Sequence, residues 1–499
     1  MRTLAWKAVK RALVLIVLGV AALFVVRAYD SQRGPPLEVW HTYVPEELHR
    51  SEIDHSDWAH YLKAEEALFE SVRAEVTQKL PPEERVPVNR YFDGSPIYPA
   101  HFTQDWNRSY VLEPDGPPVG AVVLLHGLTD SPYSLRHIAR LYREYGFVAI
   151  AIRLPGHGTV PAGLSDIEWE DWSAATRLAV REAQRRIGPT QPLHLVGFSN
   201  GGALAMMYAL EALDDAQLRR PDRITLISPM IGITAFARFA GLAGLPALFP
   251  PFAKAAWLSV LPEFNPFKYN SFPVNGARQS HLLTMALQRA IADRAADGRL
   301  EGLAPIVTFQ SVMDFTVSTR AIVSGLYRHL PDNGSELVLF DVNRSTKFGL
   351  LLNAASDTML NRVLPDPPRR FRTAVITNAT PDRNDVVERT VEAGGDAEQV
   401  RDLGLVYPFD VYSLSHVALP FPTTDSLYGQ QPDPAEDFGI HLGAVAARGE
   451  RGALIVSMDA LLRMSSNPFF PYLMQRIEEP LTPLRAERTL RDGQSAAAP

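Results

Sequence analysis

The chain has 499 residues, 46% hydrophobic and 21% charged, which is enough for one large globular domain with insertions or for two domains. Its formal net charge is −7 and no strongly basic block follows residue 30, which argues against nucleic acid as a partner. The absence of cysteine excludes a disulfide scaffold, a thiolate nucleophile and a cysteine-ligated zinc site.

The N-terminus carries an apolar stretch behind a cluster of positive charges. Four cations (Arg2, Lys7, Lys10 and Arg11) precede the uncharged run 12–26, and Arg27 closes it. The run is short for a span of about 20 residues, so residues 1–28 are a membrane anchor, which we favour, or a cleavable signal. The charge bias places the rest of the chain outside the cytoplasm, on the periplasmic side of the inner membrane in a Gram-negative host.

Residues 29–115 form a polar, mixed extension in which only one element is clearly indicated. Apolar residues within 57–80 recur near helical spacing, and Pro81 and Pro82 follow directly. The pattern predicts one helix, which either docks on the core or serves as a stalk.

From Pro117 onward, apolar strands alternate with helices. The expected strands are 121–126, 148–153, 193–198 and 223–229, and the expected helices lie near 134–145, 169–186 and 200–213. This alternation predicts an α/β fold with a mostly parallel sheet and helices on both faces, residues 116–233 forming the first half of the core. Functional sites in such sheets lie beyond the carboxyl ends of the strands.

The most informative motif is Gly197-Phe198-Ser199-Asn200-Gly201, which joins an apolar strand to an apolar helix. A sharp strand-to-helix turn of this kind lifts a serine hydroxyl above the sheet edge, where a base can activate it. Glycines are needed on both sides because side chains there would clash inside the turn. We therefore expect Ser199 to be a nucleophile.

Two further motifs end expected strands at the same sheet edge, His126-Gly127 and Pro155-Gly156-His157-Gly158. Together with the serine motif they resemble the α/β-hydrolase fold, and in particular its branch of monoacylglycerol lipases, lysophospholipases and serine aminopeptidases. The resemblance implies a Ser-Asp-His triad and an oxyanion hole made by the backbone N–H groups of Leu128 and Asn200. It implies no metal and no organic cofactor.

After the strand at 223–229 the alternation breaks, and residues 234–303 carry many large apolar side chains and several prolines. This is where the resembled fold inserts its lid. Phe249, Phe252 and Trp257 are candidates for contacting an apolar acyl group beneath the lid. The alternative is that these side chains only pack the lid onto the core.

The second half of the core is expected at 304–343, beginning with a strand that ends near Asp314. Its position resembles that of the family's acid, which orients the base and stabilises its charged form. The alternative for Asp314 is an N-cap of the helix expected at 316–330. Asp341 and Asp410 also follow apolar runs.

The base should follow the acid in the chain, which leaves His329, His416 and His441. His329 is too close to the acid and His441 lies in the tail, whereas the loop around His416 resembles the family's histidine element. The long gap between acid and base predicts an insertion at 344–402, with one possible strand at 373–377, before the core end and tail at 403–499.

These residues predict a serine hydrolase that cleaves carboxylic esters through an acyl-enzyme, with lipid substrates of the monoacylglycerol or lysophospholipid type. Its expected partners are this lipid ester and the membrane that holds the N-terminal helix. One alternative is an aminopeptidase-like peptide hydrolase, for which Glu263 is a weak candidate to bind the substrate amine. The other is a non-enzymatic, membrane-anchored scaffold that kept the fold.

Overall fold

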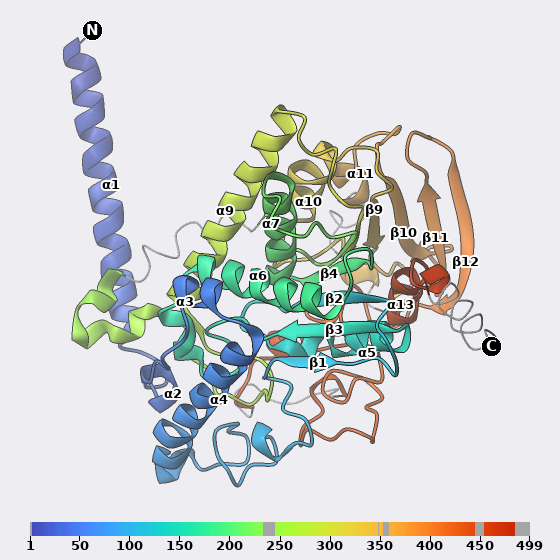
Figure 1. The fold of residues 1–499 in the computed structure, drawn as a ribbon. Coiled ribbons are helices and arrows are strands. Elements are labelled where there is room, and N and C mark those ends of the chain that lie inside the picture. Colours follow the sequence, from blue (N-terminus) through green and yellow to red (C-terminus); the bar gives the residue numbers. More distant parts are fainter. Residues whose placement is uncertain (1, 233–244, 348, 353–358, 445–453, 485–499) are drawn as a thin grey trace.

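In the computed structural model the described residues are 2–232, 245–347, 349–352, 359–444 and 454–484. They form a ten-stranded sheet with helices on both faces, and one long helix extends away from this body (Figure 1). Residues 234–244 of the expected lid lie outside the described residues.

The sheet is mostly parallel, as the sequence predicts. Its strands in chain order are β1 (Tyr110–Leu112), β2 (Gly120–Leu125), β3 (Phe147–Ile152), β4 (Leu193–Phe198), β5 (Arg223–Ile227), β8 (Ile306–Ser311), β9 (Glu336–Phe340), β10 (Arg372–Asn378), β11 (Asp385–Val391) and β12 (Glu398–Val406). Their spatial order is β1-β3-β2-β4-β5-β8-β9-β10-β11-β12. The strands from β3 to β10 in this order are parallel, and the pairs β1–β3, β10–β11 and β11–β12 are antiparallel.

Helices cover both faces of the sheet. The α-helices are α1 (Arg2–Ser31), α2 (Val39–Thr42), α3 (Arg50–His55), α4 (Trp58–Glu75), α5 (Arg136–Glu144), α6 (Trp169–Arg186), α7 (Asn200–Asp214), α9 (Val274–Ala296), α10 (Thr319–Gly325), α11 (Met359–Val363), α12 (Met458–Arg463) and α13 (Phe470–Glu478). One apolar cluster joins α6, α7 and α9 to one face, and a second joins α5 and α13 to the other. Alternate residues of a strand enter the two clusters, because successive side chains point to opposite faces.

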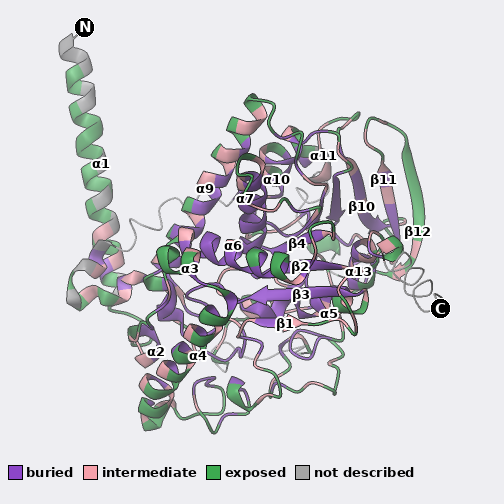
Figure 2. Cartoon of the chain, viewed as in Figure 1, coloured by how far each residue is buried: buried purple, intermediate pink, exposed green. Residues whose placement is uncertain are grey.

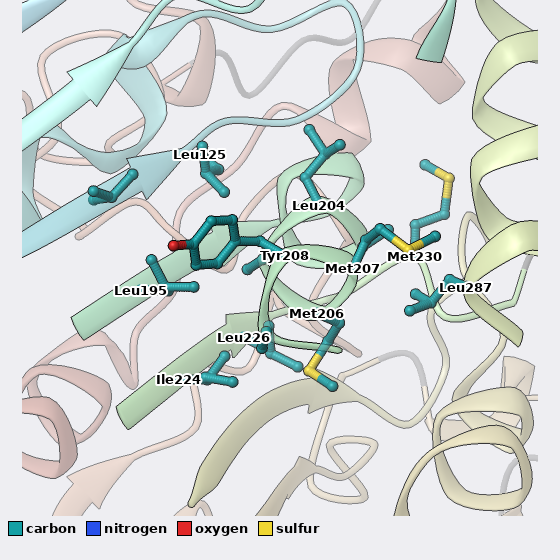
Figure 3. Packing of buried hydrophobic residues seen from close by; sticks show 14 of the residues in the cluster. Leu125, Leu195, Leu204, Met206, Met207, Tyr208, Ile224, Leu226, Met230 and Leu287 are labelled. Carbon is teal, nitrogen blue, oxygen red and sulfur yellow. The ribbon is translucent and has the colours of Figure 1, made fainter. Parts of the chain in front are cut away.

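The central strands are buried along their whole length. All residues of β2, β3 and β4 are buried, which is why, His194 of β4 apart, their sequences are apolar (Figure 2). Leu204 and Tyr208 of α7 lie among Leu125, Leu195 and Leu226 from three neighbouring strands (Figure 3). Full burial of each such side chain contributes about 1.5–3 kcal/mol, so α7 is held firmly against the strand that precedes it.

The helix expected at 57–80 is α4, followed by the short 3-10 helix η1 (Thr77–Lys79). Asp57 caps its start by accepting a 2.7 Å hydrogen bond from the backbone N–H of His60. Trp58 and Tyr61 belong to the core cluster of α6 and α7. The helix is therefore docked on the core, the first of the two expected alternatives.

Buried charges also tie the extension to the sheet. Arg153, at the end of β3, donates hydrogen bonds of 2.8 and 2.9 Å to Glu47 and of 3.1 Å to Glu65. Glu47 also accepts a 2.8 Å bond from the backbone N–H of Gly156. Because all three charged side chains are buried and mutually paired, the extension fixes the loop that follows β3.

The region 344–402, which the sequence predicts to be an insertion, contributes strands to the main sheet. The strand expected at 373–377 lies within β10, which pairs in parallel with β9, and β11 and β12 extend the same sheet. β12 is exposed along most of its length, so its sequence lacks the apolar run that marks a buried strand. The sheet therefore continues through the described part of this region.

The helix α1 leaves the body at the N-terminus, and most of its described surface is exposed (Figure 2). Its segment Lys10–Tyr29 is long and apolar enough to cross a membrane, the one such helix in the described parts of the chain. A cleavable signal sequence satisfies the same criterion.

Candidate active site

Ser199 occupies a strained turn between β4 and α7. Its backbone angles are φ 54° and ψ −114°, a conformation that non-glycine residues rarely adopt. The strand and the helix hold it there: its N–H donates to Ile227 at 3.0 Å, and its carbonyl accepts from Met230 at 2.9 Å. The serine motif thus adopts the sharp elbow that the sequence predicts.

Two glycines make this turn possible. A Cβ atom on Gly201 would lie 2.0 Å from the carbonyl oxygen of Leu125, and one on Gly197 would lie 2.4 Å from that of Gly201. Both distances are far below contact distance, so any side chain would push α7 away from the sheet. The spacing Gly-x-Ser-x-Gly is therefore required by close backbone approach.

Asp314 and His416 are hydrogen-bonded to each other. His416 Nδ1 lies 2.8 Å from Asp314 Oδ2, although 102 residues separate them in the chain. The other carboxylate oxygen of Asp314 accepts from the backbone N–H groups of Thr316 at 2.8 Å and Val317 at 3.0 Å. The N-cap of α10 is Ser318, so capping that helix is not the role of Asp314.

The Asp314 side chain is fully buried, yet its charged form is favoured. Burial raises the pKa of this carboxyl, but His416 and the N–H groups of Val317 and Thr316 outweigh burial and hold the pKa below its ordinary value. Asp314 is therefore ionised at neutral pH, as a group must be if it is to orient and stabilise an imidazolium.

The loop carrying His416 is held against the end of the sheet. The imidazole stacks on the ring of Phe198, with centroids 5.3 Å apart, and Phe198 directly precedes Ser199. Ser311, at the end of β8, donates a 2.8 Å hydrogen bond to the carbonyl of Leu414. These contacts bring His416 to the edge at which Ser199 lies.

Ser199 and His416 line one cavity of about 370 Å³. It is lined by Gly127, Leu128, Thr129, Asp130, Phe198, Ser199, Met230, Ser259, Lys268, Tyr269, Asn270, Phe272, Thr316, His416, Val417, Phe421, Tyr428 and Arg463. Leu128, one expected oxyanion residue, is in this lining, and Asn200, the other, is buried at the first position of α7. Five lining residues come from 259–272, in the region where the sequence predicts a lid.

The structure does not support the predicted acyl-contacting role of Phe249, Phe252 and Trp257. None of the three lines the cavity. Phe249 and Phe252 make edge-on contacts with Phe24 of α1, and the buried Trp257 packs edge-on against His41. Their apolar character predicts that these side chains pack against something apolar. It does not indicate whether the partner is a bound acyl chain or a helix from a distant part of the sequence.

The other acids and bases weighed in the sequence also lie outside the cavity. Asp341 accepts bonds from Arg344 and Thr377 at 2.8 and 2.9 Å, and Asp410 is exposed. His329 belongs to the short 3-10 helix after α10, and His441 bonds the carbonyl of Ser426.

His126 and His157 shape the loops that carry them. His126 Nε2 accepts a 3.0 Å bond from the backbone N–H of Leu154, and its Nδ1 lies 2.9 Å from the carbonyl of Gly127. Burial lowers the pKa of His126 well below its ordinary value and that of His157 to about 3. Both imidazoles are therefore neutral and act as structural links between the loops after β2 and β3.

Two cations that sequence reasoning missed face this cavity. Lys268 Nζ donates to Thr129 Oγ1 at 3.1 Å, and Arg463 Nη2 donates to Thr316 Oγ1 at 2.6 Å. Within the described ranges no carboxylate oxygen lies within 4.0 Å of either cation. Lys268 lies in an irregular segment and Arg463 ends the short helix α12. Single basic residues at such positions carry no sequence signal, because only the fold brings them together.

Comparison with known proteins identifies the family of this chain. The model of the alpha/beta hydrolase family matches residues 122–397, more than half of the chain. A thermostable monoacylglycerol lipase of Bacillus sp. (strain H-257) is 34% identical over 92 residues, which are 18% of this chain and 35% of that protein, so the chain spans about a third of the length of this relative.

Solved structures with a similar arrangement include the monoacylglycerol lipase of Paleococcus ferrophilus, 17% identical, covering 51% of this chain and 99% of that one with a TM-score of 0.35. A soluble variant of the monoglyceride lipase of Saccharomyces cerevisiae is 14% identical, covering 46% and 81% with a TM-score of 0.35. The assignment rests on the family match and on the parallel sheet with its serine elbow. The chain belongs to the alpha/beta hydrolase family.

Proposed function

We propose that this protein is a serine hydrolase that cleaves carboxylic esters of lipids through an acyl-enzyme. The observation that carries the proposal is the 2.8 Å pairing of His416 with the buried Asp314 at a cavity that also contains Ser199. A serine on a strained elbow, an imidazole and an ionised carboxylate are the parts that two-step acyl transfer requires.

In this mechanism Ser199 attacks the ester carbonyl while His416 accepts the hydroxyl proton through Nε2, because Nδ1 is bonded to Asp314. The N–H groups of Leu128 and Asn200 stabilise the resulting oxyanion, aided by the positive end of the α7 dipole. His416 returns the proton to the leaving alcohol. It then activates a water molecule, which releases the acyl group from Ser199.

The charge of the cavity supports one of the two lipid classes. Lys268 and Arg463 would bind an anionic group of the substrate, which a lysophospholipid has and a monoacylglycerol lacks. Burial raises the pKa of the nearby Asp130, which reduces its ability to neutralise Lys268. Burial also lowers the pKa of Lys268 itself, and Asp130 opposes that lowering. We therefore propose that the preferred ester carries a phosphate on the same glycerol as its acyl group.

Peptide hydrolysis has less support. Glu263, the candidate for binding a substrate amine, is buried outside the cavity and accepts hydrogen bonds of 3.1 and 2.8 Å from the N–H groups of Asn270 and Ser271. Burial raises the pKa of its carboxyl, which disfavours the charge that amine binding needs. Its contacts instead support a role in holding the 259–272 segment.

For location we propose that α1 is retained as an anchor and that residues from 29 onward lie outside the cytoplasm. The cations before the apolar run outnumber those directly after it, which supports this orientation. Protease treatment of spheroplasts tests it: digestion of the catalytic domain is expected, and protection of that domain would reverse the orientation.

The catalytic proposal is tested on purified full-length protein with a fluorophosphonate probe and four substrate classes: monoacylglycerols, lysophospholipids, short nitrophenyl esters and aminoacyl amides. We expect covalent labelling of Ser199 and the highest kcat/KM on lysophospholipids. The variant Lys268→Met should reduce that preference while retaining turnover of the uncharged nitrophenyl esters. No labelling at Ser199 would support the scaffold alternative, and fastest cleavage of aminoacyl amides would support the peptidase alternative.

A further inference from the structure

The C-terminal end of α1 packs against the segment formed by the 3-10 helices η7 (Leu245–Leu248) and η8 (Pro250–Ala256). Figure 1 shows this segment in yellow-green beside the helix. The ring of Phe24 lies 6.1 Å from that of Phe249 and 6.5 Å from that of Phe252, both edge-on. Arg27 Nη2 donates hydrogen bonds to the carbonyls of Trp257 at 2.8 Å and Ala255 at 3.4 Å. The helix is thus fixed to the catalytic domain at one place.

These contacts determine how deep the segment would lie in a bilayer. Phe24 is five residues before Tyr29, the last residue of the possible span. At 1.5 Å per residue it lies about 7 Å inside the end of the span. The ring of Phe249 lies 6.1 Å from that of Phe24, and Phe249 is 55% exposed. If α1 crosses the bilayer, the exposed face of Phe249 therefore lies beside the part of the helix that is within the bilayer.

The polar groups of the same region contact residues that lie beyond the C-terminal end of the possible span. Gln32 donates a 2.7 Å hydrogen bond to the carbonyl of Pro251, and Lys254 Nζ bonds the carbonyl of Arg33. Gln32 and Arg33 follow the end of the span, so these groups lie at the level of the lipid headgroups. Arg27, inside the span, directs its guanidinium to backbone carbonyls of the domain. Apolar groups are deep and polar groups are shallow, as at a membrane interface.

We infer that the segment 245–256 is a second membrane-contacting element, inserted beside α1 into the bilayer interface. Its continuation forms part of the catalytic cavity: Trp257 begins β6 (Trp257–Ser259), Ser259 pairs with Phe272 of β7 (Phe272–Pro273), and both residues line the cavity. The cavity wall is therefore three residues from a bilayer-contacting segment. The inference rests on the proposed retention of α1.

The test uses the full-length chain in lipid nanodiscs and exploits the lack of cysteine. Single variants Phe249→Cys and Val400→Cys are labelled with an environment-sensitive fluorophore. The two positions are matched in exposure, 55% and 57%, but Val400 lies on β12, far from α1 in the fold (Figure 1). Val17→Cys, in the middle of α1, reports whether the helix is in the bilayer. Both domain positions are on the surface, so unchanged thermal unfolding is expected.

We expect lipids with a doxyl quencher in the acyl chain to reduce the fluorescence at position 249 and at position 17, and aqueous iodide to quench position 400 alone. Iodide quenching at 249 without doxyl quenching, while position 17 is quenched by doxyl lipids, would overturn the inference and leave the anchor in place. Absence of doxyl quenching at position 17 would overturn both the proposed retention of α1 in the bilayer and the inference about the segment 245–256. Neither result would affect the proposed ester hydrolysis, which is measured separately on dissolved substrates.

Discussion

Asp314 Oδ2 lies 2.8 Å from His416 Nδ1, and both side chains are almost completely enclosed by the protein. The pairing determines which imidazole nitrogen is available to a nucleophile. With Nδ1 bonded to the carboxylate, the free position is Nε2, and the ring is held in the tautomer that accepts a proton there.

The variant Asp314→Asn tests this relationship. An amide cannot stabilise the imidazolium and can favour the wrong tautomer, so we expect kcat to fall by about 10⁴-fold with little change in KM. Asp341→Asn and Asp410→Asn serve as controls because Asp341 bonds Arg344 and Thr377 instead of His416, and Asp410 is exposed. Loss of turnover in Asp410→Asn instead would mean that a different carboxylate supports His416.

Replacing the nucleophile should abolish turnover without disturbing the fold. Ser199→Ala is expected to lose about 10⁶-fold in kcat, since the other triad members act only through this serine. The strained backbone at position 199 is held by Ile227 and Met230 through main-chain bonds, which alanine retains. Circular dichroism and thermal unfolding should therefore match the wild type, and fluorophosphonate labelling should disappear. Labelling of the wild type at another serine would contradict the assignment.

Two aromatic residues of the 259–272 segment line the cavity, and Phe272 is the one without a hydroxyl, since Tyr269 bonds Gly156 and Thr159 through its own. We expect Phe272→Ala to reduce kcat/KM on long-chain esters more than on acetyl esters, because each lost methylene contact is worth about 0.8 kcal/mol of burial. The ratio of the two rates within one variant is the internal control. Equal losses on both chain lengths would mean that Phe272 only supports the segment.

The sequence predicts those parts of the site that depend on local geometry. The elbow at Ser199 requires glycines within two residues, and β2 and β3 are apolar throughout because helices cover both faces. The order of acid and base along the chain then limits the candidates to a few residues, and the structure brings Asp314 and His416 together.

The sequence does not predict contacts between residues that are far apart in the chain and lie outside any recognisable motif. Phe249 has an apolar partner 225 residues earlier in the chain, Phe24, and nothing in either sequence segment indicates the other. Lys268 and Arg463 are isolated basic residues, one in an irregular segment and one at the end of α12, and β12 is too exposed to show a strand pattern. In each case the tertiary arrangement, rather than local propensity, decides the role of the residue.

A buried ion pair holds the segment that follows His416. Asp425 accepts from Arg136 at 2.7 Å and from the hydroxyl of Tyr133 at 2.9 Å, and both charged side chains are fully buried. Removing the carboxylate would leave the Arg136 charge buried with less compensation, so Asp425→Ala should lower the free energy of unfolding by about 3–5 kcal/mol. Asp437→Ala, at an exposed position, is the control in chemical denaturation. A loss below 1 kcal/mol for Asp425→Ala would mean that Glu436, the other carboxylate near Arg136, compensates.

The protein should lose stability on mild acidification because it buries neutral histidines. Burial within β4, and secondarily Arg223, lowers the pKa of His194 to about 3, against an ordinary value of 6.5. Between these two values the unfolded chain binds a proton at this position and the folded protein does not. The free energy of unfolding therefore decreases as the pH falls below 6.5, and the loss continues to about pH 3.

One histidine of this kind contributes a loss of about 2 kcal/mol between pH 7 and pH 5. The variant His194→Gln removes the titrating group and keeps a side chain that can bond the hydroxyl of Tyr142, which lies 3.1 Å from His194 Nδ1. We expect the variant to be less stable than the wild type at pH 7 and the difference to shrink by about 2 kcal/mol at pH 5. Other buried histidines, such as His157, titrate in the same direction but are common to both proteins, so they cancel in the comparison. Urea denaturation at the two pH values measures the change, and parallel pH dependences for variant and wild type would show that His194 is not neutral in the fold.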